Sequence, residues 1–265
     1  MTDHLFCDTH AHLSDEAFDE DRVQVARNAL DNGLEFIIDV GTNEKTCKVS
    51  RELSLAVDNV YTTVGWHPHD AAQTDPSKIL GQFKEWSTEK TVAIGEIGLD
   101  YHYDFSPREQ QKKIFRAQLE MAAELKLPSV IHIREAWNDA FDILSSVPLE
   151  HTGVVHCFSG NYEQARTLLD FGLYLSFTGV LAFPRSSDLR DILSKIPVDR
   201  VFFETDSPYL SPPPKRGKRN IPENVKYIVE VAASELGLNV HDLARMTTQT
   251  GRDFFNIPKR QVVKD

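Results

Sequence analysis

Cysteine is scarce in this chain of 265 residues, and its scarcity argues against two classes of protein. The three cysteines, Cys7, Cys47 and Cys157, are an odd number and show no CxxC spacing. A disulfide framework and a thiolate zinc site both need more cysteines at closer spacing, so neither is expected. We interpret all three as small buried core residues.

Long apolar runs and a targeting signal are also absent. No stretch is apolar for long enough to span a bilayer, and the first residues lack a basic segment followed by an apolar one. We therefore expect a cytoplasmic protein that does not bind membranes. Nothing in the composition indicates an obligate protein partner, and a monomer is expected.

Positive charge is the third scarce feature, because 29 Lys and Arg stand against 40 Asp and Glu and give a formal net charge of −11. A field of this sign repels polyanions, so an anionic substrate must be held by local positive charge. In other respects the composition, with 41% hydrophobic and 26% charged residues, is that of an ordinary globular protein. One domain covering residues 1–265 fits this length.

Short apolar runs bounded by turn signals recur eight times, and segments with helical periodicity separate them. This alternation predicts a parallel sheet, and eight units predict its closure into a (β/α)8 TIM barrel, an α/β fold. A doubly wound open sheet is the alternative, and the missing GxGxxG turn after the first run weakens it only slightly. The runs cover residues 5–13, 35–41, 60–65, 91–98, 129–134, 153–158, 173–179 and 200–206.

Ionisable side chains lie at the C-terminal ends of these runs, on the rim that carries the active sites of barrel enzymes. Side chains alternate between the two faces of a strand, so Glu96 is expected to share a face with Ile94 and Gly98. Six residues from five runs are expected to converge on one mouth of the barrel: His10, His12, Glu96, His132, His156 and Asp206.

Four imidazoles and two carboxylates are a donor set that suits divalent metal ions. Taken singly, a buried histidine is more often a hydrogen-bonded core residue, and an acidic residue at a strand end is often a helix cap. Six together favour a metal site, because burying them without a cation costs several kcal/mol each. Six donors exceed the need of one open catalytic ion, so two divalent ions sharing Glu96 are expected.

Seven motifs taken together resemble the TatD-type deoxyribonucleases, a family of the amidohydrolase superfamily. They run in order along the chain, and no single motif carries the resemblance. The motifs are Asp8-Thr-His-Ala-His-Leu13, Gly65-Trp-His-Pro-His69, Gly95-Glu-Ile-Gly-Leu-Asp-Tyr101, Ile131-His-Ile-Arg134, His156-Cys-Phe-Ser-Gly160, Glu204-Thr-Asp-Ser-Pro-Tyr-Leu210 and Arg216-Gly-Lys-Arg-Asn220.

The resemblance implies a TIM barrel that hydrolyses DNA phosphodiester bonds with divalent ions, typically as a 3′-to-5′ exonuclease. It implies that one ion is bound by His10, His12 and Asp206, and the other by His132 and His156, with Glu96 as the bridge. Superfamily relatives often use a carboxylated lysine as the bridge, whereas this chain has Glu96 at the end of its fourth run. The choice among Mg²⁺, Mn²⁺ and Zn²⁺ stays open.

The catalytic candidates are Asp206 and Glu96, with Asp206 expected to orient the attacking water and accept its proton. His67 and Arg134 stand at the same rim and are candidates to bind the phosphate of a DNA substrate. For His67, a turn residue held by Pro68 is an equally good interpretation.

Residues outside the mouth complete the expected site. Asp8 and Glu204 lie one layer deeper and are expected to contact the metal ligands. Arg216 and Arg219 belong to a basic segment after the eighth run, and we expect them to contact phosphates that flank the scissile bond. The simpler interpretation of that segment is a solvated loop, kept out of secondary structure by the three prolines before it.

Two other functions use the same residues. A metal-dependent deacylase or amidohydrolase, for example one acting on aminoacyl-tRNA, needs the same centre, because metal-activated water attacks a carbonyl as readily as a phosphorus atom. A non-catalytic, metal-dependent nucleic-acid binding module is the third possibility. It is disfavoured because open metal sites are typical of turnover, whereas structural sites are closed.

Overall fold

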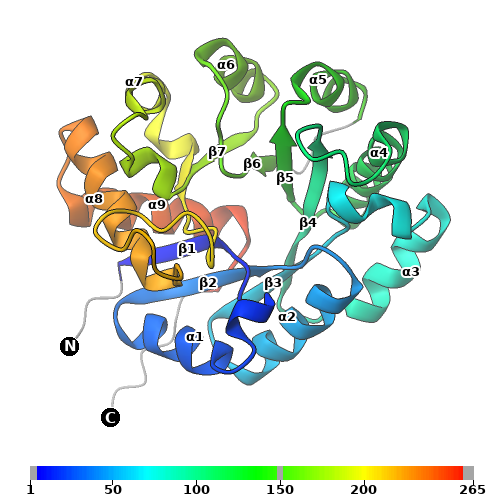
Figure 1. The fold of residues 1–265 in the computed structure, drawn as a ribbon, viewed down its shortest axis with the longest axis horizontal. Helices are drawn as coiled ribbons and strands as arrows, with labels where there is room; N and C mark the ends of the chain where they lie inside the picture. The colour runs from blue at the N-terminus through cyan, green and yellow to red at the C-terminus, as the bar shows by residue number, and fades with distance from the viewer. Residues whose placement is uncertain (1–4, 148–151, 259–265) are drawn as a thin grey trace.

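The computed structural model describes residues 5–147 and 152–258, in which strands and helices alternate (Figure 1). The strands are β1 (Phe6–Ala11), β2 (Leu34–Val40), β3 (Val60–Val64), β4 (Thr91–Asp100), β5 (Ser129–Arg134), β6 (Gly153–Val155), β7 (Tyr174–Phe177) and β8 (Val201–Phe203). The α-helices are α1 (Arg22–Asp31), α2 (Glu44–Ala56), α3 (Pro76–Trp86), α4 (Arg108–Leu125), α5 (Trp137–Ser146), α6 (Tyr162–Asp170), α7 (Ser187–Lys195), α8 (Val225–Leu236) and α9 (Val240–Phe254). Short 3-10 helices include η1 (Glu16–Phe18), η2 (Pro68–Gln73) and η3 (Gly179–Ala182).

The eight strands form one parallel sheet in the order β1 to β8, and the sheet curves until its first and last strands meet. Ala11 forms a bridge with Ser207, and the His12 N–H donates to the Ser207 carbonyl at 2.7 Å. The Asp206 N–H donates to the carbonyl of His10 at 2.9 Å. These contacts close the (β/α)8 barrel that the alternating pattern predicted, and they rule out the open doubly wound sheet.

Apolar side chains form two buried clusters, one that consists mainly of strand residues and one that joins the strands to the surrounding helices. One buried cluster includes alternate strand residues together with the end of α9: Phe36, Ile38, Val130, Val154, Phe202 and Phe255. The residues of opposite parity lie in a larger cluster that includes the helices: Ile131, Ile133, Val155, Val201 and Phe203. The strands are therefore buried on both faces, which is typical of parallel sheets.

β4 departs from the expected alternation. Its pairing with β5 shifts register between Ile94 and Ile97, and both side chains pack in the larger cluster. The expectation that Glu96 shares a face with Ile94 was therefore wrong, since Glu96 faces the histidines at the mouth of the barrel. A register shift interrupts the period of two on which the prediction relied.

α4 shows how the local sequence determines a helix. Pro107 occupies its N-cap, and Ile114, Phe115 and Leu119 form a buried apolar stripe at helical spacing. Lys126 then adopts a left-handed conformation at the C-cap and ends the helix. Among the residues that the structure describes, no helix is long and apolar enough to cross a membrane.

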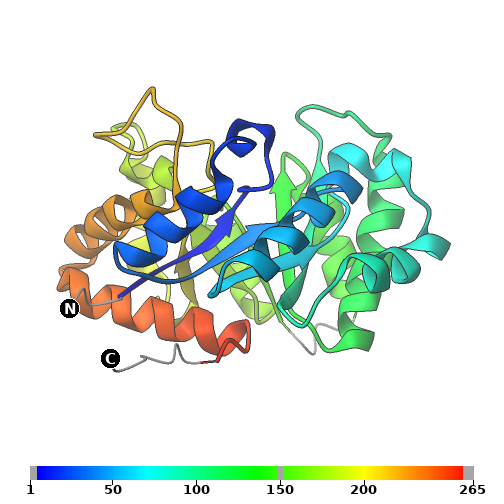
Figure 2. The same ribbon diagram turned by 90° about the horizontal axis from the view of Figure 1, so that it is seen from below.

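α9 covers the end of the barrel at which the strands begin (Figure 2). The Thr248 hydroxyl donates to the Leu5 carbonyl at 2.9 Å, directly before β1. Gly251 permits the close approach of α9, because a Cβ at this position would lie 3.3 Å from the ring of Phe36. The loops at the opposite end, where the strands finish, are therefore available to build a site.

Candidate metal centre and active-site cleft

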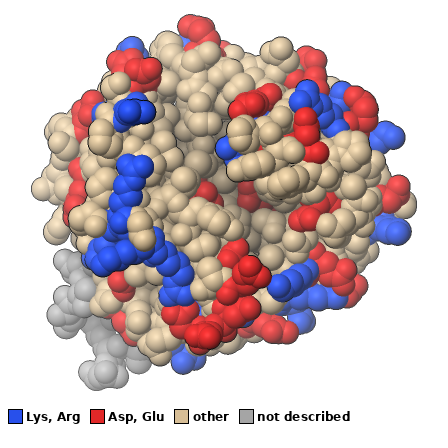
Figure 3. Space-filling model, in the orientation of Figure 1, with Lys and Arg blue, Asp and Glu red and all other residues tan. Residues whose placement is uncertain are grey.

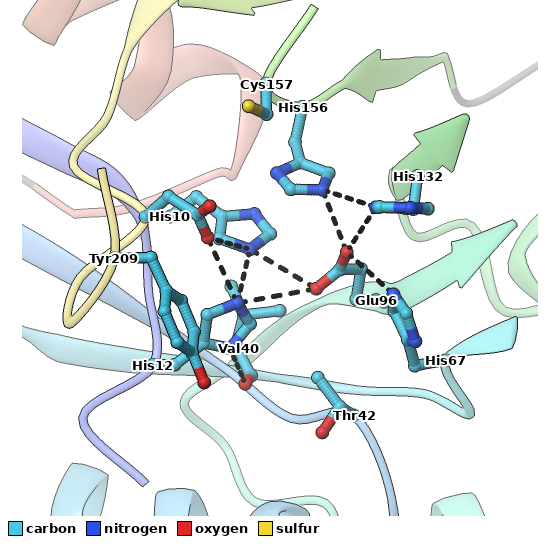
Figure 4. A network of polar contacts seen from close by, with 12 residues as sticks. His10, His12, Val40, Thr42, His67, Glu96, His132, His156, Cys157 and Tyr209 are labelled. Carbon is cyan, nitrogen blue, oxygen red and sulfur yellow. Dashed lines mark hydrogen bonds and ion pairs between the residues drawn. The ribbon is translucent and has the colours of Figure 1, made fainter. Parts of the chain in front are cut away.

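The first group of metal-binding candidates comes from β1 and the segment after β8 (Figure 4). The Nε2 atoms of His10 and His12 lie 3.1 Å apart. Asp206 Oδ1 is 3.3 Å from Nε2 of His12 and 3.8 Å from Nε2 of His10. The backbone bond between Asp206 and His10 that closes the barrel thus also brings these side chains together.

The second group comes from β5 and the residue that follows β6. Nδ1 of His132 lies 3.0 Å from Nε2 of His156. In this group, as in the first, two ring nitrogens face each other at hydrogen-bond distance, so the pair shares at most one proton between them.

Glu96 lies between the two groups, and each of its carboxylate oxygens faces one of them (Figure 4). Oε2 is 3.4 Å from His10 and 3.5 Å from His12, in both cases measured to Nε2. Oε1 is 3.0 Å from His132 Nδ1 and 2.8 Å from His156 Nε2. The structure thus brings together all six residues that the sequence assigned to the metal site.

The chemistry of these donors fits divalent cations. Imidazole nitrogens and carboxylate oxygens of His10, His12 and Asp206 form one compact group. Glu96 forms a second with His10 and His156, and a third with His67 and His132. His10 and Glu96 are almost completely buried, with 0% and 2% of their surface exposed. Buried polar groups of this kind require partners, and cations supply them.

The charges of the centre are strongly coupled. Burial raises the pKa of Glu96, but the imidazoles of His156 and His67 outweigh burial and hold this pKa well below its ordinary value. Burial opposes protonation of His156, yet Glu96 and then Glu204 raise the pKa of that imidazole well above its ordinary value. The low pKa of Glu96 therefore favours its anionic form, which is the form that can bind a cation.

Asp100 orients one of the candidate ligands, and the sequence reasoning gave it no role. Its Oδ2 lies 3.1 Å from Nε2 of His132 and 2.9 Å from Nε2 of His69. The carboxylate thus binds the nitrogen of His132 that does not face Glu96, which is the usual way in which a ligand ring is held in position. The expected fourth run ended at Gly98, whereas β4 continues to Asp100. If the expected strand had been extended to residue 100, Asp100 would have been recognised as another acidic residue at a strand end.

The two deeper carboxylates act on different parts of the ligands. Glu204 Oε1 lies 3.4 Å from Nδ1 of His156 and accepts the backbone N–H of Cys157 at 2.8 Å. Asp8 accepts the backbone N–H of His10 and binds both the N–H and the hydroxyl of Thr205. Glu204 thus contacts a ligand ring, whereas Asp8 positions the backbone that carries His10.

His67 combines the two interpretations that the sequence left open. Its Nδ1 accepts the N–H of His69 at 3.2 Å, so it caps the N-terminus of η2 as a turn residue. Its Nε2 lies 3.4 Å from Glu96 Oε1, and burial lowers its pKa to about 4. His67 therefore faces Glu96 on the same side as His132.

The candidate ligands lie in a cavity of about 720 Å³ that opens at the C-terminal ends of the strands. Arg134 lines this cleft, and its guanidinium lies 4.8 Å from the ring centre of Tyr103. Tyr209 lines another part of the wall, where its hydroxyl donates to Asp15 at 2.9 Å. The structure thus places His67 and Arg134 in one cavity with the metal-binding candidates.

The basic segment lies outside this cavity. Figure 3 shows Lys and Arg gathered over the loop between β8 and α8. Arg219 donates to both carboxylate oxygens of Asp21, at 2.9 and 2.6 Å, so its charge is locally balanced. Arg216 stacks over Phe183, with its guanidinium 4.7 Å from the ring centre. Neither arginine is among the residues that line the cleft, so their contact with phosphate stays a prediction.

Known proteins resemble this chain along nearly its whole length. A family model described as TatD related DNase matches residues 7–256. The uncharacterized metal-dependent hydrolase YabD of Bacillus subtilis is 40% identical over 96% of this chain and 100% of that protein. The 3′-5′ ssDNA/RNA exonuclease TatD of Salmonella typhimurium is 33% identical over 94% and 98%. The crystal structure of YJJV, a TatD homologue from Escherichia coli, has a TM-score of 0.89 at 28% identity, and the match covers 96% and 99%.

The family match and the arrangement of the donors lead to the same conclusion. Histidines and carboxylates from β1, β4 and β5 and from the residues that follow β1, β6 and β8 meet in an open cleft, at the end of the barrel that carries the active sites of barrel enzymes. The chain is therefore a metal-dependent hydrolase and belongs to the TatD related DNase family.

Proposed function

We propose that the protein hydrolyses phosphodiester bonds of single-stranded DNA, removing nucleotides from the 3′ end with the help of two divalent ions. One observation carries this proposal: Glu96 directs one oxygen to each of two histidine groups on the floor of an open cleft. The name of the Salmonella relative, an exonuclease on single-stranded DNA and RNA, supports the choice of substrate.

Two bound divalent ions would supply positive charge for the phosphate and a lower pKa for the attacking water. His10, His12 and Asp206 would hold one ion, and His132 and His156 the other. Glu96 would be a ligand shared by the two ions. Proton transfer and phosphate binding would fall to the side chains around this centre.

Asp206 is the candidate proton acceptor. It lines the cleft, it lies directly after β8, and its backbone is fixed by the hydrogen bond to His10. A carboxylate held in this way can orient a water molecule and remove its proton. Arg134 at the cleft wall offers a planar set of donors that fits a phosphate of the substrate strand. The guanidinium would attract an anionic strand locally, which the net charge of −11 does not.

The test compares substrates with a single metal-loaded preparation: single-stranded DNA, duplex DNA, RNA and aminoacyl-tRNA. The proposal predicts the highest kcat/KM on single-stranded DNA, and Glu96→Gln should lose that activity. Preferential release of the aminoacyl group would instead establish the deacylase. Binding of DNA without turnover would establish the binding module.

A further inference from the structure

Two aromatic rings stand exposed at the mouth of the cleft. Tyr103 and Phe105 lie in the loop between β4 and α4, with 48% and 67% of their surfaces exposed. Their rings stack almost in parallel, 5.2 Å apart and inclined by 12°. Tyr103 also lines the cleft, so this surface is continuous with the candidate active site.

The pair contacts residues that also contact the candidate metal ligands. Asp100 accepts the N–H of Tyr103 at 3.1 Å through Oδ1, while its Oδ2 contacts His132 and His69. The ring of His69 packs edgewise on Tyr103 and Phe105, with ring centres 5.5 and 4.8 Å away. The position of the exposed rings is thus tied to the position of a candidate ligand.

The charge around these rings favours an anionic, aromatic ligand. Arg134 lies over Tyr103, and among the described residues no carboxylate is within ion-pair distance of its guanidinium. The acidic residues next to Tyr103 and Arg134 in the sequence have partners of their own. Asp104 binds Arg108, and Glu135 lies 2.8 Å from Nδ1 of His102.

We propose that Tyr103, Phe105 and Arg134 form a stacking subsite for a nucleobase of the substrate strand, with Arg134 available to the adjoining phosphate. This subsite rests on the proposed function, since it binds a nucleotide next to the one being cleaved. Aromatic faces bind bases of any sequence, because every base has a π-face. The same surface suits unpaired strands, whose bases are free to stack.

Binding can be tested without turnover. A short single-stranded oligonucleotide with phosphorothioate linkages, carrying 2-aminopurine, reports stacking through quenching of its fluorescence. We expect quenching by the wild-type protein, its loss in Tyr103→Ala/Phe105→Ala, and its retention in Phe105→Trp. Tyr162→Ala is the matched control, because Tyr162 is also exposed and lies near a cation, Lys195, but does not line the cleft.

Kinetics supply the second measurement. The double alanine variant should raise KM for single-stranded DNA by about five- to 150-fold, the range measured for the loss of one stacked base. For an otherwise identical strand with abasic residues near its 3′ end, the same variant should change KM by less than about twofold, because no base is present to stack.

Three results would overturn the subsite. They are an equal loss on both strands, quenching that persists in the double variant, and a change of oligomeric state in the double variant without quenching in the wild type. The last would make these rings a contact between copies of the chain. Cleavage without quenching is a fourth result that would overturn the subsite, and it would leave the proposed function in place. Quenching by a wild-type protein that cleaves no nucleic acid would instead remove the proposed function and leave a base-binding surface.

Discussion

Replacing Glu96 by glutamine should abolish most of the thermal stabilisation that divalent ions give this protein. A ligand present at 100 times its Kd stabilises the folded state by about 2.7 kcal/mol per site. The entropy of unfolding of a 265-residue chain is about 0.56 kcal/mol/K, at roughly 2.1 cal/mol/K per residue. Each ion should therefore raise Tm by about 5 °C, and two ions by about 10 °C.

The geometry distinguishes the variants. The oxygens of Glu96 approach both histidine groups, so Glu96→Gln should lose most of the shift of about 10 °C, whereas Asp206→Asn should lose about half. Differential scanning calorimetry with and without a chelator measures these shifts. Glu135→Gln is the matched control, because Glu135 is an exposed carboxylate near the cleft that pairs with His102. A full ion-dependent shift in Glu96→Gln would refute the shared carboxylate.

Three further outcomes are expected. Asp206→Asn should lower kcat by about 10²- to 10⁴-fold with a smaller change in KM, measured on single-stranded DNA; near-normal turnover would exclude it as the proton acceptor. Arg216→Ala should reduce the slope of log K for DNA binding against log salt concentration by about one unit, and Arg219→Ala should reduce it by less, because Asp21 already balances that charge. Equal slopes in the two variants would contradict this expectation. Gly98→Ala should destabilise the fold by more than about 2 kcal/mol in urea unfolding, since its Cβ would lie 1.9 Å from the His132 carbonyl oxygen, whereas Gly81→Ala in α3 has open space and should be neutral or stabilising.

The metal-binding candidates were predictable from the sequence because the strands of a parallel barrel all finish at one rim. His10, Glu96 and His132 come from β1, β4 and β5, and the order of the strands is enough to bring them together. β6 and β8 end at Val155 and Phe203, before His156 and Asp206. This difference leaves the prediction intact, because the residues that follow a strand still lie on the same rim.

Other features depend on contacts that a local pattern cannot show. The register shift in β4 moved Ile94 away from the face of Glu96, and a period of two contains no sign of it. Asp100 was missed because it lay beyond the expected end of the strand. Arg219 pairs with Asp21, which is 198 positions away in the chain. Two charged residues on the surface carry no sequence signal that they will meet.

Analysis of products from single-stranded DNA labelled at its 5′ end tests the proposed exonuclease activity most directly. Metal-loaded protein should produce a ladder of labelled fragments that shorten stepwise from the 3′ end. Glu96→Gln, purified in the same way, should produce none, and a chelator should stop the wild-type reaction. An oligonucleotide that stays intact at metal concentrations that saturate the thermal shift would contradict the account, as would equal cleavage by Glu96→Gln.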